Sequence, residues 1–189
     1  MIRNKHPYVC PAGLAGSLDN SIRRLFHKPA KILEAYVRKE MTVLDLGCGP
    51  GYFTIELAKL AGLGGKVIAA DLQQGMLDRV AVKIGGTDLE QRIELHKCRE
   101  DTIGISQKVD FILAFWMVHE VPDQDRLFRE LKSSLKNDGT LFIIEPKFHV
   151  PLRAFESMTK LAEHTGFKIS ERPKVAFSRS ILFKSDVPE

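Results

Sequence analysis

Cysteine is scarce in this sequence: Cys10, Cys48 and Cys98 are the three thiols among 189 residues. Because they are few, odd in number and irregularly spaced, we expect reduced thiols rather than a disulfide framework. Long apolar runs are missing as well. None approaches the roughly 20 residues of a membrane-spanning helix, and residues 1–7 hold no apolar stretch of the kind that a signal peptide needs. The sequence therefore predicts a cytoplasmic protein without a membrane span.

The charges show no strong excess of one sign, but they are unevenly distributed. Residues 1–40 hold eight Lys and Arg against three Asp and Glu, residues 41–146 hold 12 against 16, and residues 147–189 hold eight against five. The basic ends either form ordinary solvated surface or help to gather an anionic substrate. No dense run of Lys and Arg has aromatic residues interleaved, so a nucleic-acid partner is not expected.

Alternating apolar and amphipathic segments dominate the rest of the chain, whose length suits a single domain. Strands are expected at 42–46, 66–70, 92–98, 109–115, 140–144, 168–171 and 175–182, and helices at 52–60, 75–84, 124–135 and 152–164. Near-continuous apolar strands that alternate with helices predict an α/β fold with a mostly parallel sheet and helices on both faces. The connection at 172–174 is too short for a crossover, so the last strand should be antiparallel.

The first 40 residues differ from this pattern. Helical spacing over 21–38 is divided by Pro29, which predicts two helices. We interpret residues 1–40 as an N-terminal helical cap on a core of residues 41–189, within one domain that spans 1–189.

A glycine-rich turn follows the first expected strand, at residues 47–51 (GCGPG), and a helix comes after it. Glycines at such a turn let the backbone bend tightly and approach a ligand. Asp71 stands about 20 residues further on, at the end of the second strand, where a carboxylate can accept hydrogen bonds from ribose hydroxyls. The pattern indicates a cofactor that contains adenosine.

The charge of Asp45 separates two candidate cofactors. A dinucleotide fingerprint would have a third glycine at position 52, where this chain has Tyr52. Asp45 lies two residues before the glycines and would repel the pyrophosphate of NAD, which a helix N-terminus otherwise attracts. S-adenosylmethionine has no phosphate and carries an ammonium and a sulfonium, which suit a carboxylate. The sequence therefore favours S-adenosylmethionine.

These motifs resemble those of the class I S-adenosylmethionine-dependent methyltransferases, in the branch that contains the ubiquinone and menaquinone biosynthesis enzymes. Residues 43–51 (VLDLGCGPG) resemble the first family motif, 69–72 (AADL) the ribose-binding loop, 109–115 the fourth strand and 135–141 the turn into the fifth. The resemblance covers about residues 30–184. It implies a Rossmann-like sheet of seven strands in the order 3-2-1-4-5-7-6, with strand 7 antiparallel. Cofactor contacts are expected at Asp45, Gly47, Cys48, Gly49, Gly51, Asp71, Leu72, Met76, Arg99, Glu100 and Ala114.

One departure from the family pattern concerns the adenine base. Relatives usually have Gly-Asp after the third strand, whereas this chain has Cys98-Arg99 followed by Glu100 and Asp101. Either of the two acidic residues takes over the contact, or the backbone reads the base, or the Arg99 plane stacks near the ring.

Candidates for the chemistry follow the fourth and fifth strands. His119 is the catalytic candidate, as a general base or as the group that orients an acceptor; the alternative is a packing role. Residues 119–123 (HEVPD) partly echo a zinc-binding helix, but Pro122 interrupts the helix and no metal site is expected. Further pocket candidates, each with a core, loop or surface alternative, are Phe115, Trp116, Glu145, Lys147 and His149, with His6, Tyr8, Arg23 and Arg24 in the cap.

The function expected is methyl transfer to a small-molecule acceptor of unknown identity, since no long insertion would build a groove for a macromolecule. Three alternatives stay open: a non-catalytic S-adenosylmethionine-binding subunit, a protein or nucleic-acid methyltransferase, and, disfavoured by Asp45, an NAD-dependent oxidoreductase. A homodimer is compatible with the sequence.

Overall fold

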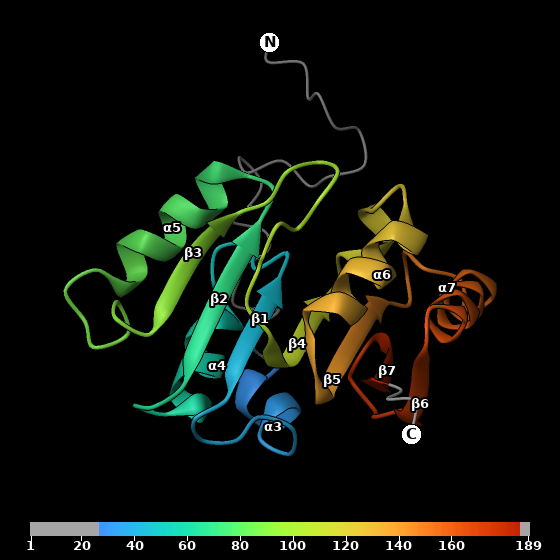
Figure 1. Ribbon diagram of the computed structural model, residues 1–189, viewed down its shortest axis with the longest axis horizontal. Helices are drawn as coiled ribbons and strands as arrows, with labels where there is room; N and C mark the ends of the chain where they lie inside the picture. Colours follow the sequence, from blue (N-terminus) through green and yellow to red (C-terminus); the bar gives the residue numbers. More distant parts are fainter. Residues whose placement is uncertain (1–26, 186–189) are drawn as a thin grey trace, which may run out of the picture.

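The computed structural model describes residues 27–185 as a twisted seven-stranded sheet with helices on both faces (Figure 1). The strand order is β3-β2-β1-β4-β5-β7-β6, and β7 alone runs antiparallel to its neighbours. The strands are β1 (Thr42–Leu46), β2 (Lys66–Asp71), β3 (Ile93–Lys97), β4 (Val109–Phe115), β5 (Leu135–Pro146), β6 (Phe167–Glu171) and β7 (Ser178–Ser185). The α/β fold class and the strand order expected from the sequence are confirmed.

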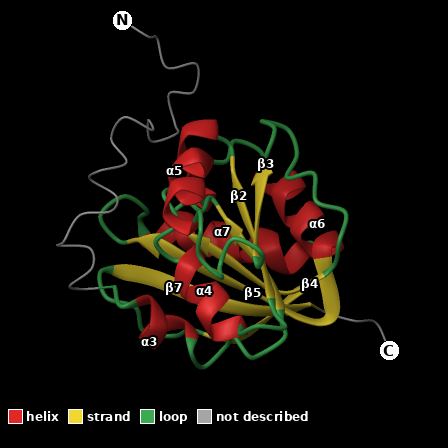
Figure 2. Ribbon diagram, turned by 90° about the vertical axis from the view of Figure 1, so that its left-hand side faces the viewer, coloured by secondary structure: helices red, strands yellow, loops and turns green. Residues whose placement is uncertain are grey.

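The helices divide between the two faces of the sheet. One face carries α3 (Pro29–Leu33), α4 (Thr54–Ala61) and α5 (Gln74–Ile84), and the other carries α6 (Gln124–Ser134) and α7 (Leu152–His164). Figure 2 shows α3 and α4 on one side of the strands and α6 on the other. A short 3-10 turn, η2 (Val118–Glu120), follows β4. None of the helices within residues 27–185 is long and apolar enough to cross a membrane.

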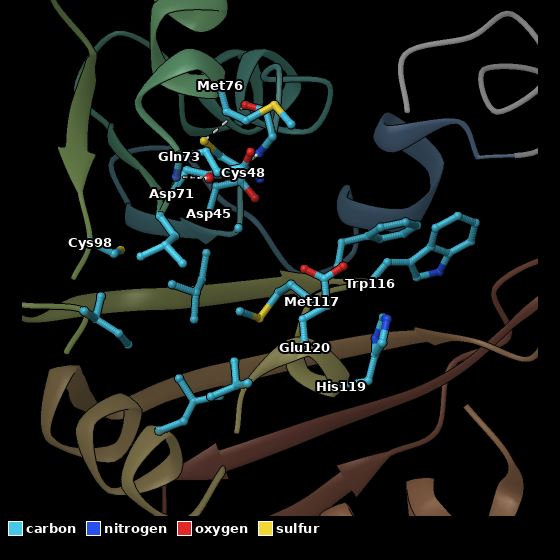
Figure 3. Close-up of a pocket in the computed structure, with 18 of the residues that line it drawn as sticks. Asp45, Cys48, Asp71, Gln73, Met76, Cys98, Trp116, Met117, His119 and Glu120 are labelled. Carbon is cyan, nitrogen blue, oxygen red and sulfur yellow. Dashed lines mark hydrogen bonds between the residues drawn. The ribbon is translucent and has the colours of Figure 1, made fainter. Parts of the chain in front are cut away.

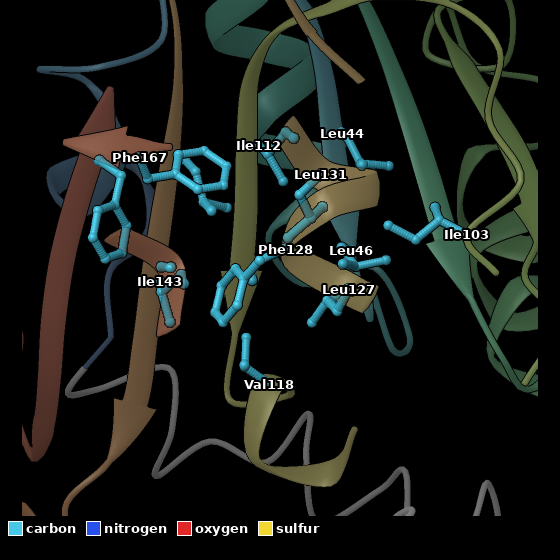
Figure 4. Close-up of a cluster of buried hydrophobic side chains, with 14 of the residues drawn as sticks. Leu44, Leu46, Ile103, Ile112, Val118, Leu127, Phe128, Leu131, Ile143 and Phe167 are labelled. Carbon is cyan, nitrogen blue, oxygen red and sulfur yellow. The ribbon is translucent and has the colours of Figure 1, made fainter. Parts of the chain in front are cut away.

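Two apolar cores separated by the sheet hold these layers together. Successive side chains of a strand point to opposite faces, so Val43 joins the core under α4 while Leu44 joins the core under α6. Figure 4 shows Phe128 and Leu131 of α6 packed over the strand residues Ile112 and Ile143. Because the central strands are covered on both sides, they read as continuous apolar runs in the sequence.

The sequence places the elements more accurately than it places their ends. The last strand begins at Ser178 rather than at 175, because Phe177 takes a left-handed backbone (φ +55°) that interrupts the extended chain. β5 begins at Leu135, well before the expected residue 140, and its pairing with β4 is irregular between Val109 and Phe111. The expected helix at 52–60 begins two residues later, at Thr54.

The N-terminal cap is described only in part. Residues 27–40 contain α3 and join the core through Leu33 and Val37. The first of the two expected cap helices lies mostly outside the described residues. So do four of the candidate substrate contacts, namely His6, Tyr8, Arg23 and Arg24.

Core packing under α6 generates a stability prediction. Phe128 is fully buried (0% exposed), so Phe128→Ala should lower the free energy of unfolding by about 3–5 kcal/mol through lost burial and the resulting cavity. Val82→Ala is the control: Val82 is 84% exposed and its truncation should cost about 0.5 kcal/mol or less. Urea denaturation of both variants measures this, and similar losses would contradict the packing described.

Candidate functional site

The glycine turn between β1 and α4 is bent by three left-handed residues. Gly47, Gly49 and Gly51 have φ values of +68°, +54° and +84°, which residues with a Cβ rarely adopt. Close approach adds a second constraint at one of them, because a Cβ on Gly47 would lie 2.9 Å from Cβ of Met117. The backbone N–H groups of Gly47 and Cys48 both donate to the Ala70 carbonyl, at 2.8 and 3.0 Å. The turn is therefore fastened to the end of β2.

The Asp71 carboxylate provides a second fastening between the same two loops. Its Oδ2 accepts the Gly49 N–H at 2.9 Å and its Oδ1 accepts the Gln73 N–H at 2.8 Å. Burial raises the pKa of Asp71 above its usual value, although these two N–H groups and the charge of Lys97 act in the opposite direction. Each carboxylate oxygen keeps further acceptor capacity toward the cavity that Asp71 lines.

Asp45 lies deeper than its neighbours in the same region. It is 2% exposed, and its Oδ2 accepts a hydrogen bond from the Thr54 hydroxyl at 2.6 Å. Thr54 is the first residue of α4, so this contact joins the end of β1 to the start of the helix. Asp45 also lines the cavity, so a buried carboxyl group forms part of the cavity wall.

These groups surround a cavity of about 640 Å³ beyond the carboxyl ends of β1 and β4. Figure 3 shows Asp45, Cys48 and Asp71 on one side, and Trp116 and His119 on the other. His119 and the expected cofactor contacts all line this cavity except Gly51 and Ala114. The exceptions have physical reasons: Gly51 faces Val80 of α5, and Ala114 is fully buried in the core under α6.

The loop after β3 forms the far wall of the cavity. Arg99, Glu100, Asp101 and Thr102 all line it. Asp101 lies between two guanidinium groups, 3.5 Å from Arg99 and 3.7 Å from Arg126, so its carboxylate is already engaged in ion pairs. The three alternatives for contacting an adenine base stay predictions.

Glu130 of α6 binds this loop through hydrogen bonds. The sequence analysis did not identify this residue. One of its oxygens accepts hydrogen bonds from the Thr102 hydroxyl, at 2.5 Å, and from the Gly104 N–H, at 2.9 Å. Burial raises the pKa of Glu130, but these donors outweigh burial and the pKa is lowered overall. The carboxylate thus stays charged and keeps the loop at the cavity wall.

The two described thiols line the cavity but have low reactivity. Cys48 and Cys98 are buried, and burial raises the pKa of both, that of Cys98 to about 12. A thiol that remains protonated at neutral pH is a poor nucleophile and a poor metal ligand. Within residues 27–185, no three His, Cys, Asp or Glu side chains are grouped so that they could hold a metal ion.

Aromatic rings form the wall opposite the two aspartates. Phe115 both lines the cavity and packs in the core, with its ring 4.3 Å from that of Phe53. Trp116 has a left-handed backbone (φ +58°), and its indole N–H donates to the Ser178 hydroxyl at 3.0 Å. Phe148, 71% exposed, meets the Trp116 ring edge-on at 5.4 Å. This wall therefore offers flat apolar surface to a ligand.

His119 belongs to η2 and lines the same side of the cavity. Its Nδ1 makes a short hydrogen bond with Oε2 of Glu145, whose side chain is 1% exposed. Burial lowers the pKa of His119, but the hydrogen bond and charge of Glu145 outweigh it, so the pKa is raised above its usual value. Among residues 27–185, no hydrogen-bond partner of Nε2 is present, and this nitrogen is free to act on a ligand.

The three candidates after β5 differ in their position relative to the cavity. Glu145 lies neither at the pocket mouth nor in an exposed loop, as the two sequence alternatives had it, because β5 extends through Pro146 and carries Glu145 into the interior. His149 lines the cavity, with its ring 5.5 Å from that of His119. Lys147 is exposed and does not line it.

A family model described as a methyltransferase domain matches residues 43–139. The match includes the glycine turn, Asp71 and His119. It confirms the family that the sequence motifs resemble.

Individual relatives agree with the family match. A demethylmenaquinone methyltransferase from Lactobacillus johnsonii is 36% identical over 130 residues, which are 67% of this chain and 50% of the relative. A ubiquinone/menaquinone biosynthesis C-methyltransferase from Escherichia coli is 28% identical over 137 residues, or 72% and 53%. The chain spans about half the length of these curated relatives. The crystal structure of an S-adenosylmethionine-dependent methyltransferase from Aquifex aeolicus has a TM-score of 0.82 at 26% identity, covering 93% of this chain and 99% of that one.

The glycine turn generates a paired prediction. Gly47→Ala and Gly49→Ala both place a Cβ on a left-handed backbone, at a cost of about 1–2 kcal/mol each. At Gly47 the Cβ also collides with Met117, whereas at Gly49 nothing lies within 4 Å. Gly47→Ala should therefore lower the free energy of unfolding by about 1–3 kcal/mol more than Gly49→Ala does. Equal free energies of unfolding for the two variants in urea would contradict this account.

Proposed function

The chain belongs to the methyltransferase-domain family of S-adenosylmethionine-dependent enzymes, and on that premise we propose that it transfers a methyl group to a small-molecule acceptor. One observation carries the proposal: a single cavity has buried carboxylates on one side, and a histidine with aromatic rings on the other. The first side suits a cationic adenosine cofactor, and the second suits a flat acceptor.

The residues of the first side fit S-adenosylmethionine in charge and space. Asp71 keeps acceptor capacity for ribose hydroxyls, and Asp45 places negative charge where an ammonium and a sulfonium would lie. Gly49 has open space where a Cβ would stand, so its backbone can approach a ligand closely. When bound, the cofactor supplies an electrophilic methyl carbon on a good leaving group. We propose that Leu72, Met76 and the loop after β3 hold the rest of the adenosine.

The second side is where we place the acceptor. Methyl transfer is an in-line displacement, and the protein contributes chiefly alignment and exclusion of water. Phe115, Trp116 and Phe148 provide flat apolar surface, which suits an aromatic ring. Two relatives are named for demethylmenaquinone and for ubiquinone/menaquinone biosynthesis, so a quinol-type ring is the first acceptor to test.

His119 is the proposed catalytic base for this transfer. Its Nδ1 is bound to Glu145 and its Nε2 has no hydrogen-bond partner within residues 27–185, so Nε2 can accept a proton from an acceptor in the cavity. An acceptor that needs no deprotonation would require only positioning by this residue. Turnover by His119 variants separates the two roles.

The alternatives are less well supported. A non-catalytic subunit would bind cofactor in the same cavity, yet it would release no S-adenosylhomocysteine with any acceptor. A protein or nucleic-acid methyltransferase would use the basic ends of the chain. An NAD-dependent oxidoreductase would set the buried charge of Asp45 against a pyrophosphate.

Asp71 gives the first functional prediction. Asp71→Ala removes the proposed ribose contact, a charge-assisted hydrogen bond worth about 1.5–3 kcal/mol, so S-adenosylhomocysteine should bind roughly 10- to 150-fold more weakly. Asp78→Ala, an exposed carboxylate on α5 that does not line the cavity, is the matched control. Calorimetry with S-adenosylmethionine, S-adenosylhomocysteine and NAD measures all three affinities. Sub-millimolar binding of NAD alone would refute the proposal.

His119 gives the second. His119→Asn removes the proposed base but keeps a polar side chain, and turnover should fall about 10²- to 10⁴-fold while cofactor affinity is unchanged. The assay is S-adenosylhomocysteine release over a panel of aromatic acceptors that begins with quinols. Turnover near that of the unmodified protein would assign His119 to packing instead.

A further inference from the structure

We propose that Glu145 is a positioning residue that orients and charges His119, and that the acceptor consequently carries an ionisable hydroxyl or an acidic C–H. The positioning role stands by itself, and only the statement about the acceptor rests on the proposed function. Sequence reasoning located Glu145 in a loop or at the pocket mouth, whereas the structure buries it directly behind His119.

Both oxygens of the Glu145 carboxylate make hydrogen bonds. Its Oε1 accepts the Val118 N–H at 2.9 Å, and its Oε2 bonds Nδ1 of His119. In its ionised form this carboxylate only accepts hydrogen bonds, and Nδ1 then carries the proton of the pair. The neutral ring therefore has its lone pair on Nε2, the nitrogen that is free to face the cavity. One carboxylate sets both the position of η2 and the tautomer of its histidine.

The location of Glu145 in the sheet makes this orientation rigid. β5 lies between β4 and β7, and Glu145 pairs across to Arg179 in the antiparallel ladder. The Arg179 guanidinium donates to the carbonyl of Val150 at 3.0 Å, and to that of Lys147 at 3.4 Å. The Arg179 guanidinium is thus engaged away from Glu145, and a carboxylate so deeply buried is stabilised whenever the His119 ring gains a proton.

Other ionisable groups also face His119. Glu120 is next in the chain and its charge raises the pKa of His119 in the same direction as Glu145. His149, from the loop after β5, lies with its ring 5.5 Å away. Glu145 differs from both because it combines a direct hydrogen bond with near-complete burial, so its removal should have the larger effect.

The proton that the acceptor loses during methyl transfer gives the His119–Glu145 pair a role. The acceptor oxygen or carbon gives an electron pair to the methyl carbon, the carbon–sulfur bond breaks, and its pair stays on sulfur. The acceptor's own proton goes to Nε2, and the resulting imidazolium is held by the Glu145 carboxylate. An acceptor without a removable proton would gain nothing from this arrangement, which is why a phenol, an enol or an activated ring carbon fits best.

Proton NMR titration of the histidine ring tests the positioning role without any acceptor. The His119 signal is assigned by its loss in His119→Asn. In Glu145→Gln, loss of the negative charge should lower the pKa of His119 by about one to three pH units. Glu120→Gln is the matched control, a neighbouring carboxylate without that hydrogen bond, and should lower it by less. An unchanged pKa in folded Glu145→Gln would overturn the proposal.

Activity provides the second readout. A base works in its neutral form, so turnover should rise with pH through the pKa of His119, and in Glu145→Gln this acidic limb should move to lower pH with a reduced kcat. S-adenosylhomocysteine affinity by calorimetry should stay the same, because Glu145 does not line the cavity. A parallel loss of cofactor binding and kcat with an unmoved limb would indicate a merely structural residue.

A pH series of Tm values for the unmodified protein and His119→Asn covers the case in which Glu145→Gln does not fold. Because the folded-state pKa of His119 is raised, the pair stabilises the fold fully below the unfolded pKa of about 6.5, and this contribution is lost as pH rises through the folded pKa. The difference in Tm between the unmodified protein and His119→Asn should therefore shrink from pH 6 to pH 9, and a constant difference would overturn the proposal. If the titration succeeds while no acceptor is turned over, the positioning role stands and the proposed methyl transfer fails.

Discussion

The Asp71 carboxylate is the interaction on which the cofactor side of the cavity depends. With one oxygen on the Gly49 N–H and the other on the Gln73 N–H, it joins the turn after β1 to the turn after β2. Together with the hydrogen bonds from the Gly47 and Cys48 N–H groups to the Ala70 carbonyl, it holds the two backbone segments at a fixed separation. The left-handed glycines permit the shape of the first turn, and the carboxylate helps to determine where that turn lies. A residue that the sequence marks as a ligand contact is also part of the framework.

Most of the fold could be predicted because its signals are local and repeated. Short apolar segments alternate with amphipathic helices along the chain, and the short connection before the last strand requires an antiparallel partner. Strand ends were predicted less well. Phe177 takes a left-handed backbone that nothing in its side chain announces, and β5 begins early through an irregular pairing with β4 that involves tertiary contacts.

Site residues were predictable where the residue type and its place near a strand end indicate a role. They were less predictable where the role depends on contact between two residues far apart in the sequence. Asp45 and Asp71 lie in the last two residues of their strands, His119 follows β4, and the topology brings them to one cavity. The Glu145 contact with His119 joins residues 26 positions apart, and the alternation of β5 gives no reason to expect a charge at a fully covered position. Glu130 was missed for the same reason, since an acidic residue on a polar helix face usually meets solvent.

The strand order has a consequence for how such a protein can diversify. Strands β1, β2 and β3 supply one side of the cavity, and the segments after β4 and β5 supply the other. The two sides are not independent, because a Cβ on Gly47 would meet Met117 after β4, and Glu130 of α6 holds the loop after β3. Substitutions after β4 therefore have to preserve contacts with the glycine turn and with that loop, which leaves the freely variable cavity positions among residues that touch neither.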